Sequence, residues 1–188
     1  VRSAGGDCPA GPPPELTVAV DRVAGRPLGL DLDIQDNCSA YVVAVRDGPF
    51  QIYNEGAQPG RELRAGDFIV KVNGADGKGA KLLDRMKRDG RLELLVRRPV
   101  ELTAVLGRSG PSKKLGIEVT NHPIGNALLL TKISAGLVRE WNERSRDQEL
   151  KVADRIVAVG GRRGTAVELK KLLEAPKVCH VTVARPAC

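Results

Sequence analysis

The first chemistry that this sequence offers comes from its backbone, at two glycines that each begin an alternating stretch. These are Leu28-Gly29-Leu30 and Leu115-Gly116-Ile117, and each follows a turn with Gly, Pro and basic residues. A glycine in the turn that enters a strand lets successive N–H groups converge, which makes a small nest for an anion. Arg26 lies beside the first turn and Lys113 or Lys114 beside the second, so either nest can gain positive charge. The alternative interpretation is that both glycines have only a structural role in ordinary turns.

Side chains suited to catalysis are scarce. His122 and His180 are the two histidines; neither belongs to a Ser/His/Asp or Cys/His arrangement, and neither has a counterpart in the other half of the chain. Cys179 and His180 are adjacent on a predicted strand, so their side chains point to opposite faces. The sequence contains no P-loop and no dinucleotide fingerprint. We therefore expect no enzyme activity within these residues, no cofactor and no metal.

An internal repeat shows which elements must position the two glycine turns. The stretch 62–74 (ELRAGDFIVKVNG) reappears as 149–161 (ELKVADRIVAVGG), an offset of 149 − 62 = 87 residues. The same offset carries Leu28-Gly29 onto Leu115-Gly116 and Met86 onto Leu173. One spacing shared by separated landmarks indicates two tandem copies of a small domain. We expect a flexible Gly/Pro linker at 1–14, a first domain at 15–99 and a second at 100–186, which should touch because the join is so brief.

The sequence of each copy predicts a mainly β domain with one short and one longer helix. Residues 30–34 alternate Leu30, Leu32 and Ile34 with aspartates, which is typical of a half-buried strand. In the first copy we expect strands at 16–20, 28–34, 41–45, 68–72 and 92–96, and helices at 50–54 and 80–89. In the second copy we expect strands at 102–106, 115–119, 128–133, 155–159 and 178–183, and helices at 137–144 and 165–174.

This order of elements resembles the PDZ family. The resemblance rests on the apolar-Gly-apolar start of the alternating strand, on a late helix, and on a Leu-x-x-Gly-Asp-x-Ile-x-x-Val-Asn-Gly block between them. The block is intact at 63–74, and the second copy departs from it at Ala153 and Gly160. The resemblance covers nearly everything after the linker. It implies two tandem, partly open β-barrels or sandwiches of the α+β class.

The resemblance also implies a site in each copy. The N–H groups of the two Leu-Gly-apolar turns would bind a peptide's terminal carboxylate, and the ligand would add a strand to the edge at 30–34 or 117–121. Its last side chain would enter a pocket beside the longer helix. In the first copy the implied peptide-binding residues are Arg26, Leu28, Gly29, Leu30, Asp31, Leu32, Leu83 and Met86. In the second copy they are Lys113, Leu115, Gly116, Ile117, Glu118, Val119, Lys170 and Leu173.

Several of these residues have plainer interpretations. Met86 and Leu173 can be core residues alone, and Asp31 and Glu118 can be surface charges rather than contacts for a basic ligand. Many family members place a His at the start of the longer helix to read Ser or Thr two residues before the ligand's end. Here that position holds Gly79 or Ala80 and Ala166. We therefore expect an apolar ligand residue there opposite Leu83, and an acidic one opposite Lys170.

The charge and the aromatic content restrict the classes of partner that the chain is expected to bind. The net charge is +7, and residues 100–188 supply 15 − 9 = +6 of it. Aromatic residues make up only 3% of the chain, too few for the stacking platforms of single-strand nucleic-acid binders. We expect protein C-termini or extended peptides as partners, no nucleic acid, and acidic membrane headgroups as an alternative partner. The rival hypotheses are a structural pair of domains with degenerate grooves and a regulatory fragment of a larger enzyme.

The cysteines and the hydropathy give an expected location. Cys8, Cys38, Cys179 and Cys188 show no CxxC spacing, which favours free thiols in a reducing compartment. No run of apolar residues is long enough to cross a bilayer. We expect a cytoplasmic protein, with the inner membrane surface as the alternative, while the first residue, Val1, suggests a fragment from which a targeting segment could have been lost upstream.

Overall fold

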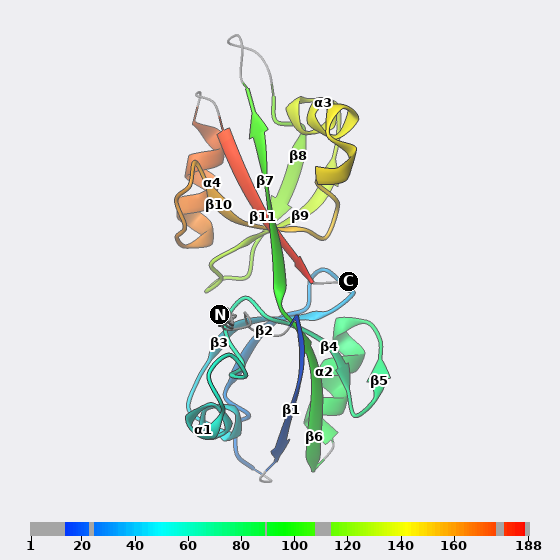
Figure 1. The fold of residues 1–188 in the computed structure, drawn as a ribbon, viewed down its shortest axis with the longest axis vertical. Coiled ribbons are helices and arrows are strands. Elements are labelled where there is room, and N and C mark those ends of the chain that lie inside the picture. Colours follow the sequence, from blue (N-terminus) through cyan, green and yellow to red (C-terminus); the bar gives the residue numbers. More distant parts are fainter. Residues whose placement is uncertain (1–13, 23–24, 89, 108–113, 176–178, 187–188) are drawn as a thin grey trace, which may run out of the picture.

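The structure of the chain is a computed structural model that describes residues 14–22, 25–88, 90–107, 114–175 and 179–186. It contains two antiparallel sheets stacked along the long axis of the molecule, each with two α-helices (Figure 1). We call the half from β1 to β6 the first unit and the half from β7 to β11 the second unit. The fold is therefore mainly β with two helices per unit, as the sequence predicts. The predicted linker at 1–14 falls almost wholly outside the described residues.

The first unit is a sheet with strand order β1-β6-β4-β3-β2, to which β5 adds beside β4. Its strands are β1 (Glu15–Asp21), β2 (Leu30–Asp33), β3 (Ala40–Val45), β4 (Phe68–Val72), β5 (Ala75–Asp76) and β6 (Arg91–Arg97). Its helices are α1 (Pro49–Gly56) and α2 (Gly79–Arg88). The strand β2 is thus an edge strand that pairs with β3 alone among the described strands.

The second unit repeats this arrangement with strand order β7-β11-β10-β9-β8. Its strands are β7 (Pro99–Leu106), β8 (Ile117–Thr120), β9 (Leu128–Ile133), β10 (Arg155–Val159) and β11 (Cys179–Pro186). Its helices are α3 (Leu137–Arg144), the one-turn 3-10 helix η1 (Arg146–Gln148) and α4 (Ala166–Glu174). The strand β8 takes the edge position that β2 takes in the first unit.

Each unit has its own aliphatic core, which the low aromatic content requires. The alternation of β6 buries Leu92, Leu94 and Val96 on the face toward the helices. On α2, Leu82 and Met86 are four residues apart and share the stripe that packs on the same core. In the second unit Leu169 and Leu173 of α4 have the equivalent role. The longer helix is therefore fixed over the sheet by a few buried leucines and one methionine.

The repeat extends to individual hydrogen bonds. Asn54 donates from its side chain to the carbonyl of Leu63 (2.7 Å) and accepts from the N–H of the same residue (2.8 Å). Asn142 makes the same pair of bonds with Leu150, at 2.8 and 2.9 Å. Each asparagine thereby connects the short helix to the loop that precedes β4 or β10. The two asparagines therefore have the same structural role in the two units.

The aspartate of the repeated block is also structural. Asp67 accepts from the side chain of Arg98 at 2.6 Å, and Asp154 accepts from Arg185 at 2.5 Å. Each carboxylate also accepts a backbone N–H three residues earlier in the chain. Burial raises the pKa of Asp67 and of Asp154, and the neighbouring guanidinium works in the opposite direction. These carboxylates brace a loop and have no place in a ligand site.

The two units touch, as the brevity of the join predicts. The strand β6 ends at Arg97 and β7 begins at Pro99, so a single residue separates the two sheets. A mixed apolar cluster joins residues of both units: Tyr41, Val43, Phe68, Ala127, Val157 and Ala184. The rings of Tyr41 and Phe68 meet edge to face, with centroids 5.2 Å apart.

Arg155 of β10 provides the polar part of this contact. Its side chain is 1% exposed and donates to Asp33 of the first unit at 2.5 Å. Its guanidinium also lies 3.5 Å from a carboxylate oxygen of Asp36 and 4.3 Å from the centroid of the Tyr41 ring. A buried charge needs such partners, because an unpaired one costs several kcal/mol. The second unit thus inserts a cation into an acidic, aromatic recess of the first.

Candidate functional site

The edges of β2 and β8 are open to an added strand. Arg46 donates its N–H to the carbonyl of Gly29, and Ser134 donates its N–H to the carbonyl of Gly116. Backbone groups of successive strand residues point to opposite sides, so Leu30, the residue after Gly29, directs its N–H and C=O away from β3. By the same alternation Ile117 faces away from β9. Each edge therefore offers backbone donors and acceptors at its first residue.

The two predicted turn glycines are required by their surroundings. Gly29 has φ of 74° and Gly116 has φ of 73°, a region that residues with a Cβ rarely adopt. A Cβ on Gly29 would lie 2.6 Å from the carbonyl oxygen of Arg46, and one on Gly116 would lie 2.7 Å from that of Ala135. The chain at these turns packs directly against the end of the neighbouring strand. These glycines therefore have a demanding structural role, and the anion nest remains a prediction.

The structure brings the predicted pocket residues of the first unit together. Leu28, Leu30 and Leu32 are half-buried and pack against the core cluster that contains Met86. Met86 itself is 0% exposed, so in this conformation a ligand could reach it only if the leucines moved apart. Leu83, on the same helix, is half-buried and faces away from the innermost core. The structure thus places Met86 in the core of the first unit, and its part in a ligand pocket stays a prediction.

The second unit gathers its residues in the same way. Leu115, Ile117 and Val119 are partly buried and pack against the cluster that contains Leu173. Leu173 is 5% exposed, slightly more accessible than its counterpart Met86. Lys170 of α4 is exposed, where the first unit has Leu83. The two sets of predicted site residues therefore share partly buried aliphatic side chains and differ at one position of the longer helix.

The charged residues of the predicted site are exposed or paired. Arg26 is exposed, and Lys113 lies outside the described residues. Asp31 forms an ion pair with Arg46, the residue after β3, at 2.8 Å. Glu118 pairs with Lys132 at 2.7 Å, a hydrogen bond that raises the pKa of Lys132. Ion pairs this exposed contribute little to stability, so both acidic residues can exchange their partner for a ligand cation.

The first turn of each longer helix lies close to the end of the edge strand. A Cβ on Gly79 would lie 2.7 Å from the Cβ of Ile34 and 2.6 Å from the carbonyl oxygen of Ser39. In the second unit Ala166 is buried and donates its N–H to the carbonyl of Gly125 at 3.0 Å. Gly79 and Ala166 are the first residues of α2 and α4, so neither longer helix begins with a His. The glycine in the first unit therefore permits a closer helix-to-strand approach than any other residue.

Both edge strands run toward the contact between the units. The last residue of β2, Asp33, binds Arg155, and the last residue of β8, Thr120, donates its hydroxyl to the side chain of Gln35 at 3.2 Å. The glycine turns at the start of β2 and β8 are therefore at the ends of these strands that are farther from the contact between the units.

Residues at this contact are absent from the sequence predictions. Arg155 occupies the position that Phe68 holds in the first copy, 87 residues earlier. A charged residue replacing an aromatic one inside a repeated apolar strand is the signal that could have pointed to it. Its partners Asp33 and Tyr41 follow no repeated motif, so their role emerges only from the packing of the two units.

Comparisons with known proteins found distant similarities to solved structures alone. No family model and no curated protein matches the chain. Among solved structures, a complex of INAD PDZ45 with NG2 peptide is 18% identical, covers 96% of this chain and 95% of its own, and has a TM-score of 0.41. A complex of INAD PDZ45 with NORPA CC-PBM is 17% identical, covers 95% of this chain and 96% of its own, and has a TM-score of 0.39. The PDZ-like description of the two units rests on their own element order and sheet topology.

None of the helices within the described ranges is both long and apolar enough to cross a membrane.

Proposed function

We propose that this chain is a non-catalytic protein-interaction module that binds the C-termini of other proteins, or extended peptides, in the grooves between β2 and α2 and between β8 and α4. The observation that carries this proposal is the pair of open strand edges, each of which begins at a glycine turn that can turn backbone N–H groups toward a carboxylate. An added strand would satisfy the outward backbone groups of Leu30 and Ile117.

Energetics favour a weak and reversible interaction. Two or three charge-assisted hydrogen bonds contribute about 1.5–3 kcal/mol each, and one buried aliphatic side chain contributes about 1.5–3 kcal/mol. Association costs about 4–15 kcal/mol in lost freedom. A Kd of about 1 μM, which corresponds to about −8.2 kcal/mol, is the expected affinity of one groove. Such affinities suit a scaffold or adaptor that exchanges its partners.

The two grooves should select different ligands. Leu83 offers an apolar surface and Lys170 a positive charge at equivalent places on the two longer helices. We infer that the first groove prefers an apolar residue, and the second an acidic one, two positions before the ligand's end. Selection of Ser or Thr at that position from a library of C-terminal peptides would contradict this inference.

A titration followed by nuclear magnetic resonance tests the proposed function. Peptides with a free C-terminus should shift the amide signals of Gly29 or Gly116, because the terminal carboxylate accepts hydrogen bonds at these turns. The same peptides with an amidated C-terminus serve as the matched control and should leave both signals in place. Binding that is equal for the two forms, or silence of both glycines at millimolar peptide, would contradict carboxylate capture. Salt-sensitive binding to anionic vesicles with silent glycines would support the membrane-surface alternative.

A further inference from the structure

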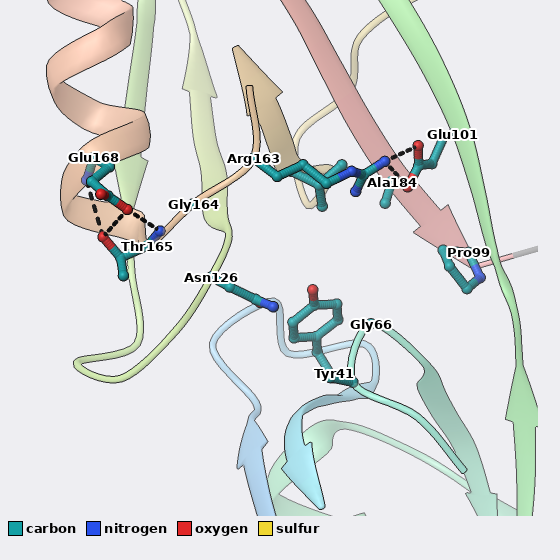
Figure 2. A pocket seen from close by; sticks show the side chains of 12 residues that line it. Tyr41, Gly66, Pro99, Glu101, Asn126, Arg163, Gly164, Thr165, Glu168 and Ala184 are labelled. Atoms are coloured by element: carbon teal, nitrogen blue, oxygen red, sulfur yellow. Dashed lines mark hydrogen bonds and ion pairs between the residues drawn. The ribbon is translucent and has the colours of Figure 1, made fainter. Parts of the chain in front are cut away.

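A cavity lies where the open end of the second groove meets the first unit. Its volume is about 500 Å³, and Figure 2 shows its lining. From the second unit it is lined by Asn126, Val157, Arg163 and Thr165, and from the first unit by Tyr41 and Ala65, among others. Clefts of about 300–1,000 Å³ between domains are common ligand sites. Two PDZ-like units side by side thus create a space that neither has alone.

Two lining residues show that the cavity adjoins the second groove. Thr165 is the N-cap of α4, the helix that forms one wall of the groove. Asn126 follows Gly125, whose carbonyl accepts the N–H of Ala166, the first residue of that helix. The opposite wall, β8, ends at Thr120, which already bonds to Gln35 of the first unit. A chain that leaves the groove at this end therefore passes between the two units.

The direction in which a peptide would pair with β8 determines which of its residues lie closest to the cavity. A ligand that pairs antiparallel with β8, with its carboxylate at Gly116, has its earlier residues beside Thr120 and the start of α4. A strand advances about 3.3 Å per residue, so the four residues of β8 match only the last few residues of the ligand. Residues farther from the C-terminus reach the cavity.

The lining defines the chemistry that fits. Val157, Ala184 and Pro99 form an apolar floor, since these side chains lie outside the core of the second unit. Tyr41 is 2% exposed, and its hydroxyl, directed toward the cavity in Figure 2, has no hydrogen-bond partner within the described ranges. This oxygen is not one of the sealed, unpartnered polar atoms of the described residues, so it is open to the cavity and can hydrogen-bond to a ligand. Arg163 is held in place by two hydrogen bonds to Glu101, at 2.6 and 2.9 Å.

We propose that this cavity is a second subsite for the ligand of the second groove, which receives an extended peptide segment just upstream of the C-terminal tail. The segment would place an aliphatic side chain on Val157 and Ala184 and would hydrogen-bond to the hydroxyl of Tyr41. The pair of units then reads a longer sequence than either unit could read by itself. This inference rests on the proposed function, because it requires a tail bound in the second groove.

Two peptide lengths and two variants test the proposal in the intact chain. The probes are a C-terminal peptide of about six residues, selected from a random library for shifts at Gly116, and versions lengthened upstream to about fourteen residues with random residues added. Ala65→Trp fills the cavity from the first unit without changing the groove. Val152→Trp is the matched control, because Val152 is the equivalent residue of the second copy, is 56% exposed and borders a different hollow beside α3.

The best long peptides should bind about tenfold more tightly than the short one, which corresponds to about 1.4 kcal/mol. They should also shift the amide signal of Gly66, and Ala65→Trp should remove the gain while leaving the short peptide unaffected. Long peptides that bind no better, or a gain that survives Ala65→Trp, would overturn the subsite. If no short peptide binds and Gly116 stays silent, the groove itself is refuted, which is a separate outcome. Equal losses in Ala65→Trp and Val152→Trp would also overturn the proposal.

Discussion

At the scale of single residues, the most consequential difference between the two copies is Phe68 in one and Arg155 in the other. Both lie at the contact between the units, and the guanidinium of Arg155 sits over the ring of Tyr41. Cation–π contacts of this kind contribute about 2 kcal/mol when they are shielded from water. The same arginine is bonded to Asp33, so one side chain joins an acidic and an aromatic neighbour of the other unit.

The titration of Tyr41 provides a test at this scale. Burial raises the pKa of Tyr41 above its ordinary value of 10.0, and the charge of Arg155 opposes that shift. The unfolded chain therefore loses this proton at a lower pH than the folded chain, so the stability present below pH 10 falls as the pH rises further. In a Tyr53→Phe variant, ultraviolet absorbance of tyrosinate reports Tyr41 alone, since the chain has two tyrosines. An ordinary tyrosine titration in the folded variant would contradict the described burial.

At the scale of elements, the sequence predicts the strands and helices well because short-range patterns determine them. The alternation at 30–34 and the β-branched runs of the other strands decide the sheets, and the structure confirms β9, α3 and β10 with the predicted bounds. Two elements were missed: β5 has two residues and η1 has one turn, too short to show any period. The predicted strand at 28–34 is shorter in the structure, because Gly29 has positive φ and Ile34 already leaves the sheet.

The predicted peptide-binding residues could be named from the sequence, whereas the residues that pair at the contact between the units could not. The pocket residues could be named in advance because the repeat shows each one twice. Their proximity follows from the fold, and their role in binding is still a prediction. Arg155, Asp33 and Tyr41 could not be paired in advance, since their contact depends on how one unit rotates onto the other. No local pattern encodes that rotation.

The N-terminus of α4 supports a prediction about a single element. Thr165 accepts the N–H of Glu168, and Glu168 reaches back to the N–H of Thr165, a reciprocal capping box. Thr165→Ala should reduce the free energy of unfolding by about 1 kcal/mol, measured by chemical denaturation. Thr165→Ser keeps the oxygen and serves as the control, which should stay close to the wild type. Equal stability of the Ala and Ser variants would show that the cap contributes nothing.

At the scale of the whole molecule, the contact between the units combines an apolar cluster with buried ion pairs, in which Arg155 contacts Asp33 at 2.5 Å and Asp36 at 3.5 Å. Removing one member of such a pair leaves an unpaired charge out of water, whereas replacing both with apolar residues is often neutral. Arg155→Met should therefore lower the free energy of unfolding by about 3–5 kcal/mol. Adding Asp33→Leu should recover much of that loss, as a double-mutant cycle of denaturation experiments would show. A double variant as unstable as the sum of the two single ones would contradict direct pairing.

Arg98, the lone residue between the two sheets, has a consequence for motion. Its side chain is held by Asp67 and by the carbonyls of Gly60 and Glu62, at 2.6, 2.7 and 2.9 Å. The backbone N–H of Arg98 also donates to the carbonyl of Pro14 at 2.8 Å, so both the side chain and the backbone of the connecting residue are bonded to the first unit. A rotation of the second unit relative to the first would have to occur around a residue that is anchored on one side only.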